Sequence, residues 1–519
     1  MNRQMSSEPA CDPIQGGEWE KPFESKVVGI HTALLHNGKV LFFTYPSKHG
    51  QDNHEHSHGS ADTSGDCEIF DSVQLQVEKV DLKRNIFCGG ACFLDDGRLF
   101  VAGGQYQTIF SLWDPPSRDI HTFDPEEKKW IRPKEGNKPI QMRGRWYPSC
   151  VTLPDGKVLV ISGRYSFMAI HFWTFRFVNN TLQIFDAKTN VLSAAEQVPF
   201  KIELYPFLHV LPSGKIFVHS ETTSRLYIPS SKSWDKVPGS ADFTEYETEH
   251  KYSRTNPGQG TSILLPLLPT SNPPYRARVL LVGGAGSDSP KIDTPATNTA
   301  EIIDFSEANP KWRYTLPMRH PRVMPDGIIL PDGKVLIVSG SERGKSDQAV
   351  NPVLEPELFD PMSETWTTLC PMTVPRLYHA TAILLPDARV LVAGTDAEWN
   401  RPPYSKDQRN VEIFKPPYLF RNSRPQIAQV QTEITYNNAF EIKSPDSKDI
   451  ASVALIRSSA VTHSLNTDQR YLGLEILSTN TNKLRVRAPP TPNVAPPGWY
   501  MAFIVEDDVP SISKFVRLS

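Results

Sequence analysis

Short apolar runs separated by turn residues repeat along most of the chain. Val40–Tyr45, Val158–Gly163 and Val335–Gly340 are typical examples. Such runs span roughly five to eight residues, which suits a buried strand and is too short for an amphipathic helix. Many of them are joined by a tight turn that contains glycine, as in β-hairpins. The pattern therefore predicts an all-β protein.

One unit of about sixty residues recurs, which indicates a repeat fold. The turn glycines Gly38, Gly97, Gly156 and Gly214 are 58 or 59 residues apart, and the next step, to Gly333, is 119 residues, or two periods. We place the missing copy at residues 260–286, where two apolar runs flank a longer loop. The turns are His36-Asn37-Gly38, Asp95-Asp96-Gly97, Pro154-Asp155-Gly156, Pro212-Ser213-Gly214, Pro331-Asp332-Gly333 and Pro386-Asp387-Ala388.

The second half of the unit also recurs, as a strand that ends in a Phe-Asp-Pro corner followed by a tryptophan. Phe123-Asp124-Pro125 with Trp130 and Phe359-Asp360-Pro361 with Trp366 are the clearest copies. Four strands per unit, with Gly-Gly after the second, predict one blade of a kelch-type β-propeller. The units between residues 27 and 420 predict a seven-bladed propeller. A β-sandwich with evenly spaced turns is the alternative, and the repeated corner argues against it.

The period stops after Pro416-Pro417-Tyr418-Leu419. The remaining residues hold alternating strand-like segments at 451–456, 484–488 and 498–505. Their length and number suit an immunoglobulin-like β-sandwich. We therefore expect three parts: a polar tail at 1–26, the propeller at 27–420 and the sandwich at 421–519.

Composition narrows the possible partners. The formal net charge is -3, from 55 Lys and Arg against 58 Asp and Glu, so no basic excess favours nucleic acid. No apolar stretch reaches the roughly 18 residues that a membrane-spanning helix needs. Residues 1–26 are polar and contain no apolar export segment.

The six cysteines do not form a recognisable framework. None lies in a Cys-x-x-Cys pair, which argues against a zinc knuckle. Six in a chain of this length do not indicate a disulfide scaffold. Cys88 and Cys92 fall in one strand-like stretch, where side chains four residues apart share a face without disulfide geometry.

Residues with metal-binding side chains occupy one place in the repeat. Cys88, Tyr147 and the adjacent pair Tyr378 and His379 each lie just before an inner strand and its turn. Adjacent residues in a regular strand face opposite sides, so Tyr378 and His379 can share one metal only at a strand start or bulge. A closed ring brings such positions to one axis. His463 can join them only if the C-terminal part sends a loop into the ring.

Each of these residues has an ordinary structural reading. A lone tyrosine or histidine in a strand usually packs or hydrogen-bonds, and Cys88 alone resembles a small buried hydrophobe. Their joint placement favours the metal site. His49, His54, His56 and His58 form a separate cluster among polar residues, which we interpret as a solvated loop of the first blade and leave out of the site.

From about residue 27 to 519, the chain resembles the copper-radical oxidases, the family of glyoxal oxidase and galactose oxidase. Two motifs are more similar in sequence to the glyoxal oxidase branch than to galactose oxidase. They are Arg145-Trp146-Tyr147 and Pro321-Arg322-Val323-Met324-Pro325-Asp326-Gly327. The other matching segments are Asn85–Gly90, Pro375–Ala382, Val461–Ser464 and Pro496–Met501.

This resemblance implies a role for each residue. Cys88 would be linked through a thioether to Tyr147, which would bind copper and carry a radical. Tyr378 would be the axial ligand and proton acceptor, with His379 and His463 as the imidazole ligands. Tyr165 occupies the position where galactose oxidase has a tryptophan stacked on the linked tyrosine. The family is typically secreted, so the compartment stays open.

The implied activity is oxidation of small aldehydes, as hydrates, or of primary alcohols by O₂, with H₂O₂ as product. Imidazole and phenolate ligands suit Cu(II). Copper changes by one electron while the substrate loses two, so the Cys88–Tyr147 cofactor would supply the second. We expect a monomer with no nucleic-acid partner. The alternative is a non-catalytic kelch-type propeller that binds proteins or glycans.

Overall fold

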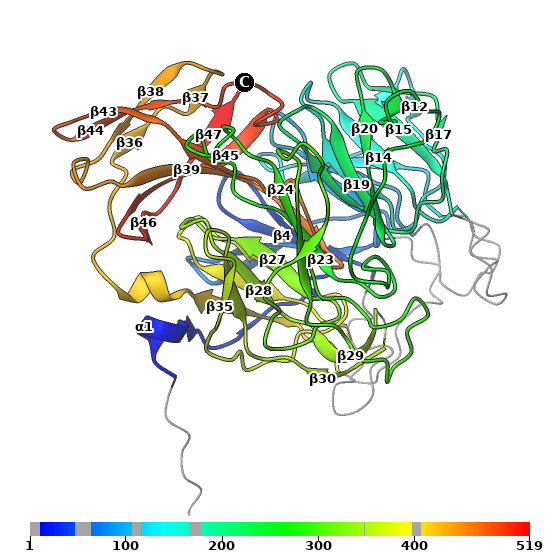
Figure 1. The fold of residues 1–519 in the computed structure, drawn as a ribbon, viewed down its shortest axis with the longest axis horizontal. Helices are drawn as coiled ribbons and strands as arrows, with labels where there is room; N and C mark the ends of the chain where they lie inside the picture. The colour runs from blue at the N-terminus through cyan, green and yellow to red at the C-terminus, as the bar shows by residue number, and fades with distance from the viewer. Residues whose placement is uncertain (1–10, 47–63, 106–115, 166–177, 347, 397–405) are drawn as a thin grey trace, which may run out of the picture.

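The computed structural model describes residues 11–46, 64–105, 116–165, 178–346, 348–396 and 406–519 (Figure 1). Helix is confined, among these residues, to α1 (Pro13–Gly16) and the 3-10 turn η2 (Pro417–Phe420). All other regular structure is β-strand, so the prediction of an all-β protein is confirmed. The histidine cluster at 49–58 lies outside the described residues. No helix among them has the length and apolar character that crossing a bilayer requires.

Most of the described chain forms antiparallel sheets built on a row of four strands, to which some sheets add one or two further strands, and each sheet is named here by its first strand. In order they are β3 (His31–Leu34), β4 (Val40–Thr44), β5 (Asp66–Asp71) and β6 (Gln76–Lys79); β7 (Gly90–Phe93), β8 (Leu99–Ala102), β9 (Ile120–Asp124) and β10 (Lys129–Ile131); β13 (Ser149–Thr152), β14 (Val158–Ile161), β15 (Thr181–Asp186) and β16 (Val191–Leu192); β18 (Phe207–Val210), β19 (Ile216–Ser220), β20 (Thr223–Ile228) and β21 (Ser233–Trp234); β23 (Thr261–Leu264), β24 (Arg278–Val282), β25 (Ala300–Asp304) and β26 (Arg313–Tyr314); β27 (Asp326–Ile329), β28 (Val335–Val338), β31 (Glu357–Asp360) and β32 (Thr365–Thr368); and β33 (Thr381–Leu384), β34 (Val390–Ala393) and β35 (Asn410–Lys415) with β1 (Glu18–Trp19).

The first strands of these sheets lie beside one another. β7 contacts β13, β13 contacts β18, and the series continues through β23, β27 and β33 to β3. Nearly every residue of these strands is buried on both faces, which explains their almost continuous apolar sequence. The number of blades and their closure into a propeller remain a prediction.

The N-terminal segment completes the last sheet. β1 pairs with β35, and β2 (Phe23–Glu24) pairs with the other end of the same strand. A disulfide joins Cys11 to Cys370, a pair that was not predicted from the sequence. Among the described residues the other cysteines are free and buried, and Cys88 and Cys92 are unpaired as expected. The start of the chain is therefore fastened to a segment more than 350 positions away.

The C-terminal residues form two further sheets, which lie to one side of the others in Figure 1. Leu455, Leu484 and Tyr500 are among the buried residues of their shared core. One sheet contains β36 (Gln429–Val430), β38 (Ala439–Lys443), β44 (Lys483–Arg487) and β43 (Ile476–Asn480); the other contains β37 (Glu433–Ile434), β47 (Lys514–Leu518), β45 (Gly498–Glu506), β39 (Ser452–Arg457) and β42 (Tyr471–Leu474), with β46 (Val509–Pro510) beside β45.

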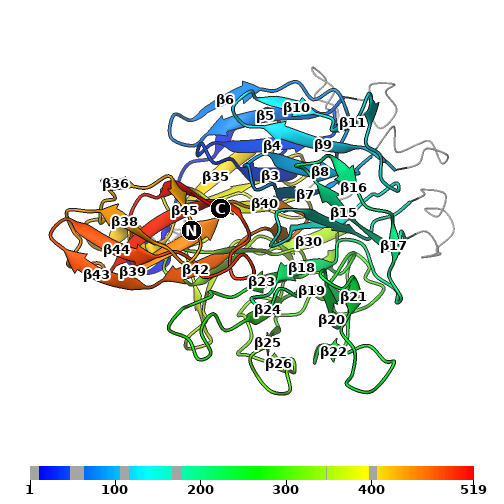
Figure 2. The ribbon, with the colours of Figure 1, turned by 90° about the horizontal axis from the view of Figure 1, so that it is seen from above.

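One hairpin leaves this C-terminal part. It consists of β40 (Ala460–Thr462) and β41 (Leu465–Thr467), with His463 and Ser464 at its tip. β40 pairs with β3, through Thr32 and Val461, and also contacts β7. In Figure 2 β40 lies close to both strands. The hairpin thus carries His463 among the first strands of the repeated sheets.

Smaller elements complete the description and take no part in the site. They are β11 (Lys134–Glu135) with β12 (Lys138–Pro139), β17 (Glu196–Gln197), β22 (Tyr246–Glu247), and β29 (Ser341–Lys345) with β30 (Gln348–Pro352).

Candidate metal centre

The same backbone kink precedes the first strand of several sheets. The residue two positions before the strand has a left-handed φ of 60° at Cys88, 63° at Tyr147 and 64° at His379. A residue other than glycine rarely adopts this conformation, and its cost indicates a functional constraint. Tyr205 (φ 48°) and Met324 (φ 60°) occupy the same position. The kink takes these residues out of the regular alternation of side chains in the strand that follows.

The kink also explains how two adjacent residues serve one site. The rings of Tyr378 and His379 lie face to face, with centroids 3.7 Å apart and an interplanar angle of 26°. Trp146 and Tyr147 repeat this arrangement, also with centroids 3.7 Å apart and an angle of 12°. The expectation that Tyr378 and His379 lie at a strand start is therefore confirmed, and the left-handed residue is its cause.

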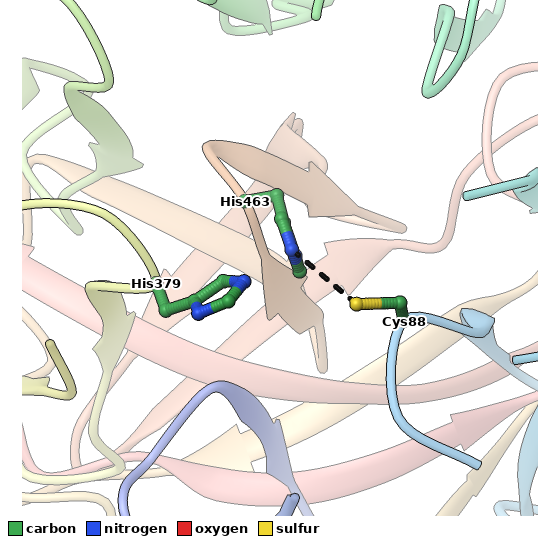
Figure 3. A group of neighbouring side chains, drawn as sticks. All are labelled: Cys88, His379 and His463. Carbon is green, nitrogen blue, oxygen red and sulfur yellow. Dashed lines mark hydrogen bonds between the residues drawn. The ribbon is translucent and has the colours of Figure 1, made fainter. Parts of the chain in front are cut away.

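His463 reaches these residues from the hairpin tip, where its φ is 50°. Gln259 Nε2 donates a hydrogen bond to the His463 carbonyl oxygen. Thr261 Oγ1 donates to the carbonyl oxygen of Ser464 at 2.9 Å. The β23 sheet therefore holds the backbone of the tip, and the imidazole projects toward the other ligand candidates (Figure 3).

Two phenols and two imidazoles meet in one buried place. The hydroxyls of Tyr147 and Tyr378 are hydrogen-bonded to each other, and His463 Nε2 lies 3.0 Å from Tyr147 Oη. The ring centroids of His379 and His463 are 4.4 Å apart. All four side chains are buried. The structure thus brings together residues 147, 378, 379 and 463 from three separate parts of the chain.

Hydrogen bonds on the far side of each imidazole determine which ring nitrogen faces the site. Thr462 Oγ1 donates to the carbonyl oxygen of Ile30 at 2.9 Å, so its single proton is used. It must therefore accept from His463 Nδ1–H, which lies at 2.6 Å. Nε2 of His463 consequently carries a lone pair toward the tyrosines.

His379 shows the same arrangement with a carboxylate. Its Nδ1–H donates to Asp396 Oδ2 at 2.7 Å, and both side chains are buried. Its Nε2 is buried without a hydrogen-bond partner among the described residues. A carboxylate behind the imidazole of a metal ligand orients the ring and raises its basicity. Tyr45 Oη also donates to Asp396 Oδ2, at 3.3 Å.

Burial determines the charge state of the site. It lowers the pKa of the His463 imidazole well below its usual value, and nearby His379 and His31 lower it further. It also raises the pKa of the Tyr147 phenol well above its usual value, with Cys88 and Tyr378 adding to the effect. A phenolate at Tyr147 therefore needs a compensating positive charge in the same place.

Cys88 lies at the edge of this group. Its Sγ is 3.7 Å from His463 Nε2, as the dashed line in Figure 3 marks. Cys88, His379 and His463 each offer a ligand atom within 4.8 Å of the others. Burial raises the pKa of the Cys88 thiol well above its usual value, and a side-chain hydrogen bond with Tyr147 opposes that shift. The thiol is therefore next to Tyr147 and protonated.

Tyr147 is enclosed between two aromatic rings. Trp146 covers it at 3.7 Å between centroids, and Tyr205 stacks on it at 4.4 Å and 23°. Tyr205 was not among the predicted site residues, although it stands nine residues before its turn Gly214, as Tyr147 does before Gly156. Tyr165 follows the isolated bridge residue Arg164, and its side chain is 44% exposed. A role for Tyr165 above the linked tyrosine stays a prediction.

Buried arginines fix the segments that carry the ligands. Arg376, three residues before His379, donates to the Gly394 carbonyl oxygen at 2.6 Å and to Glu412 Oε2 at 3.3 Å. Arg145, before Tyr147, donates to the Thr181 carbonyl oxygen at 3.0 Å and to Gln183 Oε1 at 3.3 Å. Both guanidinium groups are fully buried. Each arginine ties a ligand segment to the second and third strands of its own sheet.

The donor set fits a copper ion. Two imidazole nitrogens and two phenol oxygens converge, and one of these nitrogens, His379 Nε2, has no hydrogen-bond partner among the described residues. Nitrogen and oxygen donors of this kind suit Cu(II), and the cation supplies the charge that a buried phenolate requires.

Comparisons with known proteins agree with this geometry. The glyoxal oxidase N-terminus family model matches residues 30–418, and the galactose oxidase-like early-set domain model matches residues 424–518. Aldehyde oxidase GLOX1 of Arabidopsis thaliana is 31% identical over 87% of this chain and 77% of its own length. Aldehyde oxidase GLOX of Vitis pseudoreticulata is 27% identical over 97% of each chain.

A solved structure shares the fold. It is described as a novel fungal alcohol oxidase with catalytic diversity among the AA5 family, in complex with copper. It is 21% identical, with a TM-score of 0.75, over 97% of this chain and 100% of the other. A galactose oxidase of Gibberella zeae is 25% identical over 84% of this chain and 61% of its own length.

Proposed function

Because the chain belongs to the glyoxal oxidase family, we propose that it is a copper-radical oxidase that converts small aldehydes, as hydrates, or primary alcohols with O₂ and releases H₂O₂. The observation that carries the proposal is the meeting of Tyr147, Tyr378, His379 and His463 in one buried place. A protein- or glycan-binding propeller has no need of two imidazoles whose lone pairs face two phenols.

We also propose the architecture that delivers these residues. Residues 27–420 would form a seven-bladed kelch-type propeller and residues 421–519 an immunoglobulin-like sandwich. The series of contacts between first strands from β7 round to β3 supports the ring, and the two matched ranges, 30–418 and 424–518, support the division.

Copper would be held by Tyr147, Tyr378, His379 and His463, and when bound it supplies a one-electron couple and a position for the substrate oxygen. The Cys88–Tyr147 thioether provides the second oxidising equivalent, because substrate oxidation removes two electrons. The hydrogen bond between the Cys88 thiol and the Tyr147 side chain, within one buried cluster, supports this assignment. The linked ring is easier to oxidise than an unmodified phenol.

The residues divide the substrate's two hydrogens between them. Tyr378, as a phenolate once its own proton has left, would accept the hydroxyl proton of the alcohol or hydrate, since its oxygen is hydrogen-bonded to that of Tyr147 and so faces the same point. Tyr147, as a radical, accepts the hydrogen atom from the carbon. Trp146 and Tyr205 cover both faces of its ring and exclude water from it. We keep Tyr165 as a further shielding candidate.

Peptide mapping after copper loading in air tests the proposal. We expect one cross-linked peptide that contains Cys88 and Tyr147 and lacks two hydrogens. A peroxide-coupled assay with methylglyoxal, glyoxal, glycerol and galactose should then show copper-dependent turnover of at least one. Unlinked peptides together with no peroxide would leave only a binding scaffold.

A further inference from the structure

His31 touches the Cys88 segment without reaching the proposed metal. It is the first residue of β3, and its side chain is buried. Its Nε2 accepts a hydrogen bond from the backbone N–H of Cys88 at 3.0 Å. Its ring centroid is 6.1 Å from that of His463. His31 therefore lies beside the site and has no part in the donor set described above.

The surroundings of His31 keep it as an acceptor. Burial lowers the pKa of its imidazole to about 3, and nearby His379 contributes in the same direction. The ring is therefore neutral, and because Nε2 accepts, the proton is on Nδ1. Phe43 stacks on the ring, with centroids 4.5 Å apart and an angle of 11°. The orientation of the acceptor lone pair is thus set by packing.

Cys88 needs such support because its backbone is strained. Its φ of 60° places it in the left-handed region without being a glycine. The Tyr147 N–H donates to the Cys88 carbonyl oxygen at 3.0 Å, and Tyr205 Oη donates to the Gly89 carbonyl oxygen at 3.2 Å. Those bonds hold the C-terminal side of Cys88. The bond to His31 holds the N-terminal side.

We infer that His31 is a positioning residue for thioether formation: by accepting the Cys88 N–H, it holds the kinked backbone so that Sγ faces the ring of Tyr147. The inference rests on the proposed function. In the step it serves, a bond forms between Sγ and the ring carbon next to the hydroxyl of Tyr147, while one S–H and one C–H bond break. The two electrons and two protons pass to O₂, which becomes H₂O₂.

The test compares two replacements of His31. His31→Gln offers a side-chain oxygen that can accept the Cys88 N–H, whereas His31→Met has similar volume and no comparable acceptor. His209→Met is the matched control, because His209 is also buried, with a pKa lowered to about 3, and bonds Ser262 in another sheet. Copper-free proteins receive Cu(II) in air, and linked peptide is quantified against time by mass spectrometry.

We expect His31→Met to form the link at least about 10-fold more slowly than the wild type, because misplacement by an ångström can cost a factor near 100. His31→Gln should stay within about 3-fold, and His209→Met should match the wild type. Cu(II) affinity, measured separately, should change less than about 3-fold in both His31 variants, since His31 binds no metal.

The outcomes separate this inference from the proposed function. Linkage in His31→Met at the wild-type rate overturns the role of His31 and leaves the oxidase intact. Absence of linkage in the wild type overturns the cofactor itself. If His31→Met does not fold, ¹⁵N shifts of the imidazoles in copper-free wild type decide the matter. A proton on Nδ1 of His31 supports the inference, and a proton on Nε2 refutes it.

Discussion

Asp396 accepts the Nδ1–H of His379 at 2.7 Å, so Nε2, on the opposite side of the ring, is left for the site that His379 shares with Tyr378 and His463. Sequence patterns did not single out Asp396, because it lies 17 residues after its partner in a different strand connection. The carboxylate therefore orients a proposed ligand without itself binding the metal.

Asp396→Asn should weaken Cu(II) binding by about 10- to 100-fold, because the amide neither orients the imidazole as firmly nor raises its basicity. Competition titration against a chelator measures the loss. Asp119→Asn is the control, since Asp119 is a buried carboxylate paired with Arg132 in the β7 sheet. Equal affinities for Asp396→Asn and wild type would show that Asp396 does not support the metal.

Trp146→Ala should shorten the lifetime of the Tyr147 radical at least about 10-fold, because one face of the ring becomes open to water and reductants. Trp146→Phe should retain most of the lifetime. Decay of the radical's absorption and its EPR signal provide the measurement. Tyr165→Ala should have the smaller effect, since that side chain is 44% exposed. The reverse order would assign the shielding to Tyr165.

Glu412→Gln should lower copper affinity as well as stability. The substitution leaves buried Arg376 without its carboxylate partner, which lowers the free energy of unfolding by about 3 kcal/mol. Copper affinity should fall as well, because Arg376 holds the segment that carries Tyr378 and His379. Glu357→Gln is the control, because it removes the equivalent carboxylate from Arg322, which precedes Met324 and no proposed ligand. Denaturant unfolding should show similar losses for both. Only Glu412→Gln should lower the Cu(II) affinity measured by chelator titration. Equal losses of affinity in both variants would show that Arg376 does not position the ligands.

Copper affinity should rise with pH between about 6 and 9. Burial keeps the His463 pKa well below its usual value, so protons do not compete there across this range. The Tyr147 pKa is raised, so metal binding must release that phenol proton, and affinity gains about tenfold per pH unit for each proton released. Calorimetry in buffers of different ionisation enthalpy counts the protons. Tyr147→Phe should reduce the count by one.

His463→Ala should abolish copper-dependent peroxide formation while the repeated sheets stay folded. The imidazole contributes one of the proposed ligands, and its loss removes the only one supplied by the C-terminal part. Far-ultraviolet circular dichroism checks the fold, and the coupled assay checks activity. Normal turnover would exclude the hairpin from the mechanism.

Much of the site could be predicted because the repeat places Cys88, Tyr147 and His379 at one offset from their turn glycines or the equivalent Ala388. Counting nine residues back from Gly214 identifies Tyr205 in the same way. Counting along the repeat could not predict that Trp146 stacks on Tyr147. That stack depends on the left-handed φ of Tyr147, which a residue other than glycine rarely adopts. The disulfide between Cys11 and Cys370 could not be predicted either. The two cysteines are 359 residues apart, and only the folded chain brings them together.

The hairpin that presents His463 has a consequence for biosynthesis. Tyr147 and Tyr378 emerge from the ribosome well before His463 does, so a nascent or prematurely terminated chain lacks one side of the copper site. The proposed copper site is thereby completed only after translation has passed the β40–β41 hairpin.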